Sequence, residues 1–131
     1  MILAVCADDR LGMSFGGRRQ SKDAEVRRKL LALSGGALRM SDYSARQFDE
    51  PVYHGADYLS GSKSGDWCFA ESADYEDFIE KIEKIVLFRW NRHYPADVYF
   101  RFLGKWVLTG SEDFPGSSHE KITMEVYDKC E

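Results

Sequence analysis

The chain has 131 residues, of which 44% are hydrophobic, which is enough for one domain around a single apolar core. We therefore expect a single domain over residues 1–131. No stretch has the composition of a disordered segment or the long apolar run of a membrane span, and the net charge of −4 argues against a dedicated nucleic-acid-binding protein.

Positive charge is concentrated in one segment. Between Arg10 and Lys29 there are seven basic residues and two acidic ones, so this segment carries +5 and the remainder carries −9. Two interpretations are open. The segment could form a local site for an anion or a polar partner, or it could be a helix face whose charges are solvated.

The cysteines and the first residues bear on the cellular compartment. Cys6, Cys68 and Cys130 are odd in number and unrelated in spacing, so they predict no disulfide framework. Residues 1–7 lack the basic start of a signal peptide and are followed by charged residues, which favours a core strand. We therefore expect a cytoplasmic protein.

The first part of the chain predicts a strand, a loop and a helix. Residues 2–7 form an apolar strand, and a glycine-rich loop follows over 8–20. Ser21 is the expected N-cap of a helix that stops at Gly35. Three apolar side chains recur at helical spacing and should pack on a sheet: Val26, Leu30 and Leu33.

The middle of the chain completes a strand–helix–strand unit. A short strand over 37–40 is followed by a brief helix that Ser41 or Asp42 can cap. Residues 49–65 show little periodicity, and 67–70 predict another apolar strand. This order implies parallel strands joined by right-handed crossovers.

The rest of the chain is rich in strands. A helix that Asp74 can cap precedes the strongest apolar strand, over 84–90. Shorter runs follow over 98–100 and 106–109, and 122–127 alternate between apolar and polar as in a half-buried antiparallel strand. The predicted fold is α/β, with a mixed, mostly parallel sheet, flanking helices and an antiparallel C-terminal hairpin.

Four stretches carry motifs in an order known from one enzyme family: residues 2–12, 38–48, 96–100 and 117–127. They resemble dihydrofolate reductase. The first is similar to its opening strand and D-x-x-I-G loop, the second to V-I-M-G-R-x-T-[WF], the third to D-T-x-F-P and the last to the closing H-x-Y-x-F-E-I strand. The resemblance implies a reduced form of that fold, with Ser44 in the place of a threonine and Phe48 in the place of an apolar pocket residue.

The same resemblance indicates that the cofactor site is lost. The Gly-Gly pair that lets the family's backbone approach the nicotinamide corresponds to Ala70-Glu71-Ser72-Ala73, and the Gly-Arg that holds a cofactor phosphate corresponds to Ser41-Asp42. The segment that builds the adenine side is reduced to 49–65. The proline–tryptophan motif is replaced by Arg18-Arg19-Gln20-Ser21-Lys22-Asp23, with Asp23 within one position of the pterin-binding carboxylate. We expect no NADPH cofactor.

Polar residues that lead into the first helix form one candidate site. Arg18, Arg19, Gln20 and Asp23 combine guanidinium groups with a helix N-terminus, and both favour a phosphate or carboxylate. The alternative is a solvated loop.

Two further candidate residues lie in the second half of the chain. Arg92 could reach a ligand at the sheet edge, or it could belong to a simple turn. His119 stands among hydroxyls and charged groups, and histidine is the usual general acid or base near neutral pH. The alternative for His119 is an exposed side chain in a polar loop. The candidate catalytic residues are therefore Asp23 and His119.

Metal binding is not indicated, because the three histidines and three cysteines show neither C-x-x-C nor H-E-x-x-H spacing. The chain also resembles a group of short bacterial proteins labelled ribonuclease Z. That label implies a His-x-His-x-Asp-His metal motif, which is missing from this sequence. We therefore do not expect ribonuclease Z activity of this protein.

The leading hypothesis is a bacterial or phage protein that binds a small anionic or nucleotide-like molecule and is not an NADPH-dependent reductase. Its expected pocket lies beside Arg18 and Arg19 and is lined by Val5, Ala7, Asp23, Phe48 and Val98. Two alternatives stay open. One is an enzyme, either a divergent reductase or a phosphoester-cleaving enzyme that uses His119 with an arginine. The other is an interaction protein, such as an inhibitor from a mobile element, with an acidic contact surface.

Overall fold

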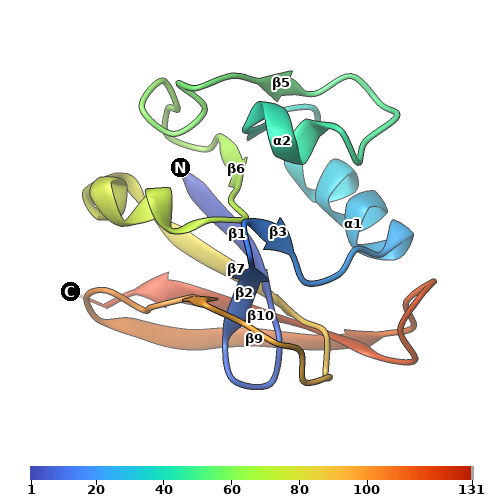
Figure 1. Ribbon diagram of the computed structural model, residues 1–131. Helices are drawn as coiled ribbons and strands as arrows, with labels where there is room; N and C mark the ends of the chain where they lie inside the picture. The colour runs from blue at the N-terminus through green and yellow to red at the C-terminus, as the bar shows by residue number, and fades with distance from the viewer. Residues whose placement is uncertain (131) are drawn as a thin grey trace.

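The computed structural model describes residues 1–130, and a seven-stranded sheet forms its centre (Figure 1). In sheet order the strands are β5 (Tyr53–His54), β4 (Leu38–Met40), β6 (Trp67–Phe69), β1 (Ile2–Ala7), β7 (Lys84–Arg89), β10 (Ile122–Lys129) and β9 (Trp106–Phe114). The first five run parallel to one another, and β10 and β9 form the antiparallel end. The predicted α/β class with a mixed, mostly parallel sheet is confirmed.

A second, three-stranded antiparallel sheet contains β3 (Arg18–Arg19), β2 (Gly12–Phe15) and β8 (Val98–Tyr99). The prediction of an irregular loop over 8–20 is therefore wrong. Gly16 and Gly17 adopt left-handed φ angles of 60° and 76°, which a two-residue hairpin turn requires. The hairpin places both arginines of β3 on an ordered strand.

Helix α1 (Ala24–Ser34) begins at Asp23, whose side chain accepts a hydrogen bond from the backbone N–H of Glu25 at 2.8 Å. The expectation that Ser21 is the N-cap is therefore wrong, because the extended residue before the first turn is Asp23. The helix ends as predicted at Gly35, which has a left-handed φ of 58°.

The other two helices are shorter or tighter than expected. Helix α2 (Asp42–Ala45) is capped by Ser41 and ends before Phe48. The 3₁₀ helix η1 (Ala73–Lys81) has Ser72 at its N-cap and is kinked at Phe78. Asp74 is therefore not the cap, and its carboxylate accepts the hydroxyl hydrogen bond of Tyr58 at 2.8 Å.

Helices α1 and η1 cover opposite faces of the central sheet (Figure 1). Alternate residues of β1 point to each face, so Ala4 packs beneath α1 while Val5 and Ala7 pack on the η1 side. Leu30 is fully buried, but Leu33 is 43% exposed because the buried position of the last helical turn is Ser34. The prediction that Leu33 packs on the sheet is therefore wrong.

Strands β9 and β10 form a long antiparallel ribbon that runs past the N-terminus of α1. Strand β9 continues five residues beyond the predicted end at Thr109, to Phe114. All three cysteines are free thiols, and Cys68 is buried in the core. Among the helices of the described residues, none has the length and apolar character needed to cross a membrane.

The packing of α1 gives a matched pair of stability predictions. Leu30→Ala should lower the free energy of unfolding by about 2–5 kcal/mol, because it leaves a cavity against the sheet. Leu33→Ala should change it by less than about 0.5 kcal/mol, because the side chain is largely solvated. Urea unfolding measures both, and equal losses would contradict this orientation of the helix.

Candidate functional site

The topology of the sheet identifies one edge where a ligand site is expected. Strands β1 and β6 are neighbours, but the chain leaves β1 through α1 toward β4 and leaves β6 through η1 toward β7. Open α/β sheets bind ligands at the carboxyl ends of strands where the connections diverge in this way. The residues that follow Ala7 and Phe69 therefore define the region of interest.

A buried carboxylate–imidazole pair lies beside this edge and joins α1 to the β9–β10 connection. Asp23 is 1% exposed and His119 is 4% exposed. Asp23 Oδ2 lies 2.9 Å from His119 Nδ1. The structure thus brings the two candidate catalytic residues into direct contact, and the alternative of an exposed His119 is wrong.

Three backbone groups and a hydroxyl also donate to the Asp23 carboxylate at 2.8–3.1 Å: the N–H groups of Glu25, Ser117 and Ser118, and Ser117 Oγ. Burial alone would raise the pKa of Asp23, but the hydrogen bonds from His119 and these groups outweigh it and lower that pKa. Asp23 is therefore an anion that accepts a hydrogen bond from the Nδ1–H of His119, which in the neutral ring leaves Nε2 as an acceptor.

The far edge of the imidazole contacts two hydroxyl groups. His119 Nε2 lies 3.0 Å from Ser21 Oγ and 3.2 Å from the hydroxyl of Tyr94. The ring of Trp90 stacks on the imidazole with a centroid distance of 4.5 Å and an interplanar angle of 19°. The ring of His119 is therefore fixed at both nitrogens and on one face.

The loop that carries His119 approaches Asp23 closely at Gly116. The Gly116 N–H donates to the carbonyl of His119 at 3.0 Å, which closes a turn. A Cβ atom at position 116 would lie 2.5 Å from Asp23 Oδ2. Glycine is therefore needed here for the loop to reach the carboxylate.

A second buried carboxylate, Asp8, follows β1 and holds the neighbouring segments. It accepts hydrogen bonds from the side chain of Gln20 at 3.0 Å and from the N–H of Tyr94 at 3.1 Å. It also accepts from the N–H groups of Arg10 and Gly12. Burial opposes ionisation, but these hydrogen bonds outweigh it and lower the pKa of Asp8.

Glu71, two residues after β6, organises a third polar cluster. Its carboxylate accepts from Arg19 Nε at 2.9 Å and Arg19 Nη2 at 3.1 Å, a bidentate ion pair. Ser44 Oγ donates at 2.8 Å and Gln47 Nε2 at 3.1 Å. The sequence interpretation treated Arg19 as an anion ligand, whereas the charge of its guanidinium group is compensated by Glu71.

A narrow cavity, which we call the inner cavity, separates the Asp23 and Glu71 clusters. Its polar lining residues are Ser21, Asp23, Arg27, Gln47 and Glu71. Its volume is about 10 Å³, which is room for one water-sized group. Arg27 Nη1 is buried and has no hydrogen-bond partner among the described residues.

A wider pocket, which we call the outer pocket, lies on the other side of Glu71 and has a volume of about 300 Å³. This is the lower end of the range for small-molecule sites. Glu71 lines both spaces. The other lining residues are mainly small or hydroxylic: Ser14, Gly17, Ser41, Tyr43, Ser72 and Val98.

The remaining predicted site residues do not join this cleft. Phe48 packs edge-on against Phe69 in the core at 6.3 Å. Val5 and Ala7 point to the opposite face of the sheet, so the predicted pocket of five residues does not exist as one set. Arg18 is exposed on β3, and Arg92 lines a separate pocket of about 450 Å³.

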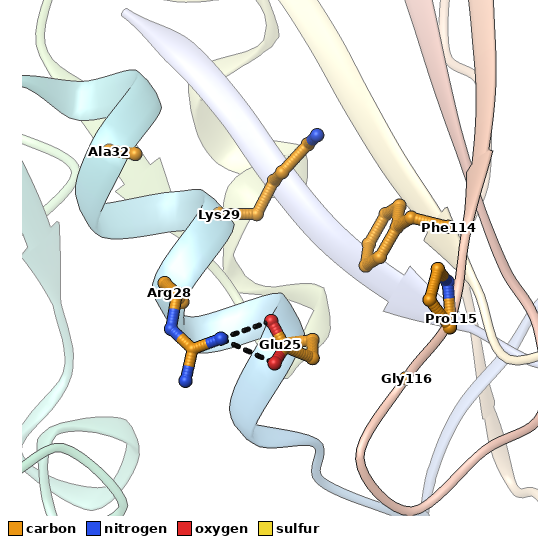
Figure 2. A pocket seen from close by; sticks show the side chains of 7 residues that line it. All are labelled: Glu25, Arg28, Lys29, Ala32, Phe114, Pro115 and Gly116. Carbon is orange, nitrogen blue, oxygen red and sulfur yellow. Dashed lines mark hydrogen bonds and ion pairs between the residues drawn. The ribbon is translucent and has the colours of Figure 1, made fainter.

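An open groove of about 480 Å³ lies between α1 and the end of β9. Figure 2 shows the side chains that line it. Its cations are compensated, because Arg28 is hydrogen bonded to Glu25 and Lys29 Nζ lies 3.0 Å from Glu112. Lys29 Nζ also lies 5.0 Å from the centre of the Phe114 ring. This groove is therefore a weaker candidate for an anion than the cleft.

No protein-family model matches the chain, and the comparison with curated proteins finds no match. Within residues 1–130, no group of three or more histidine, cysteine, aspartate or glutamate side chains is arranged to hold a metal ion. The function of the cleft is therefore inferred from the residues that line it.

The lowered pKa of Asp23 gives a pH prediction. Its charged form stabilises the fold fully above the ordinary carboxyl pKa of about 4, and this contribution is lost as the pH falls below that value. Urea unfolding as a function of pH should therefore show a smaller acid-induced loss for Asp23→Asn than for wild type. The acid-induced loss of stability that remains in the variant includes the contribution of Asp8, whose pKa is also lowered. Identical pH dependence of the two proteins would contradict the assignment.

Proposed function

We propose that the protein binds a small anionic or nucleotide-like molecule in the cleft formed by the inner cavity and the outer pocket. The scaffold that we propose is a reduced dihydrofolate reductase-like fold without NADPH-dependent reductase activity. The observation that carries the proposal is that Arg27, which lines the inner cavity, has a buried Nη1 without a hydrogen-bond partner among the described residues.

The free energy of a buried donor explains why Arg27 points to a ligand. Leaving a buried polar group without a partner costs about 1–3 kcal/mol, and more when the group is charged. A phosphate or carboxylate oxygen is the natural acceptor for a guanidinium N–H. One such oxygen matches the size of the inner cavity, which is about 10 Å³.

The bulk of the ligand would occupy the outer pocket. Three serine hydroxyls and the phenol of Tyr43 line that pocket and can donate to or accept from a sugar or base: Ser14, Ser41 and Ser72 are the serines. Glu71 lines both spaces and is paired with Arg19, so the ligand contacts a compensated carboxylate there and not a free anion.

Glu71 also supports the proposal that NADPH is not the ligand. It stands where the resembling family has a glycine pair that admits the nicotinamide. Here the side chain of Glu71 occupies that position, and its carboxylate accepts hydrogen bonds from Arg19 and Ser44. Asp42 adds a negative charge where that family has a phosphate-binding arginine.

A thermal-shift screen of nucleotides, cyclic nucleotides and pterins, followed by calorimetry of each hit, tests the proposed function. NADPH in the same screen should give no saturable signal. For a hit, Arg27→Gln should weaken binding by about 10- to 150-fold, the equivalent of about 1.5–3 kcal/mol for a charge-assisted hydrogen bond.

Arg28→Gln is the matched control, because Arg28 is the next residue, is exposed and is already bonded to Glu25. It should leave the affinity unchanged. Micromolar NADPH binding, or a hit whose affinity is insensitive to Arg27→Gln, would contradict the proposed site.

A further inference from the structure

Three side chains beside the inner cavity form a linear hydrogen-bonded series. Ser21 Oγ lies 3.0 Å from His119 Nε2, and His119 Nδ1 lies 2.9 Å from Asp23 Oδ2. A hydroxyl within reach of an imidazole, which is itself oriented by a buried carboxylate, is the arrangement of an activated nucleophile.

We propose that Ser21 is a nucleophile that accepts an acyl group, and that the protein hydrolyses a small carboxylic ester at the inner cavity. His119 is the general base and acid, and Asp23 is a positioning residue. This activity goes beyond the proposed binding function. Both use the inner cavity and Arg27, but the acyl acceptor is Ser21, which the binding of an anion does not need.

The imidazole is held in the orientation that a base requires. Asp23 accepts a hydrogen bond from the Nδ1–H, so Nε2 of the neutral ring faces Ser21 and can take its proton. Asp23 is kept ionised by its backbone donors, and Trp90 fixes the plane of the ring. The orientation of His119 therefore does not have to be acquired during the reaction.

Tyr94 shares the same acceptor nitrogen. Its hydroxyl lies 3.2 Å from Nε2, slightly farther than the 3.0 Å of Ser21 Oγ. Nε2 has one lone pair, so the two hydroxyls compete for it. Tyr94 is therefore not required for proton transfer from Ser21.

The reaction balances without a further reagent except water. Ser21 Oγ attacks the ester carbonyl carbon while His119 Nε2 takes the hydroxyl proton. The bond from that carbon to the alkoxy oxygen then breaks, and the leaving alcohol receives the proton from Nε2. Water attacks the acyl-serine, His119 takes a proton from the water, and Ser21 regains it as the carboxylic acid leaves.

In this mechanism Arg27 stabilises the negative charge that develops on the carbonyl oxygen of the ester. Arg27 lines the same cavity as Ser21, and its Nη1 is buried without a hydrogen-bond partner among the described residues. A donor aimed at an oxyanion in a water-poor site stabilises the transition state strongly. The inner cavity, about 10 Å³, has room for one water-sized group such as the carbonyl oxygen, so an ester of a small acid such as acetic acid is the expected substrate.

p-Nitrophenyl acetate is the probe. The full chain should release p-nitrophenol, and peptide mapping by mass spectrometry should find the acetyl group on Ser21. Ser21→Ala should abolish that acetylation and the associated release. Ser60→Ala is the control, because Ser60 is exposed between β5 and β6 and does not line the inner cavity, and it should react like wild type.

Two further variants separate catalysis from folding. Asp23→Asn should slow acetylation of Ser21 by about 100-fold or more and change its pH profile, in samples that circular dichroism shows to be folded. Tyr94→Phe should retain acetylation. Acetylation confined to lysines, or a rate unchanged in Ser21→Ala, would overturn the proposal and assign the three residues a structural role. A failed ligand screen with intact Ser21 acetylation would overturn only the binding function.

Discussion

The buried charge of Asp23 is the interaction on which the rest of this edge of the molecule depends. One carboxylate caps α1, accepts the N–H groups of Ser117 and Ser118 in the turn after Gly116, and orients His119. These contacts join residues more than ninety positions apart in the chain. Removing a hydrogen-bond partner of a buried charged group costs more than the roughly 1–3 kcal/mol of a neutral one, so the cluster contributes to stability whatever its chemical role.

The topology of the sheet explains why polar residues gather here. Side chains that follow β1 and β6 meet at the edge where the two crossover connections diverge. Asp8 and Glu71 occupy those positions, and each is satisfied by donors from other segments. Together they hold the segment from Arg19 to Ser21 over the inner cavity, which sets both the narrowness of the cavity and the place of Ser21.

The sequence predicted the fold better than the site. Apolar runs such as Lys84–Arg89 and the alternation in Ile122–Lys129 report local burial, and local burial decides strands and helices. Asp23 and His119 were recognised as reactive types, but no local pattern reveals that they touch, or that Tyr94 and Ser21 contact the same nitrogen. The pairing of Arg19 with Glu71 was missed for the same reason, since it joins residues that only the tertiary fold brings together.

The position of the proton on His119 tests the central claim most directly. Nitrogen-15 NMR of the imidazole distinguishes a protonated ring nitrogen from an unprotonated one. The account predicts that the neutral ring carries its proton on Nδ1, hydrogen bonded to Asp23, and that Nε2 is unprotonated. A neutral ring protonated on Nε2 would contradict the account, because His119 could then accept no proton from Ser21.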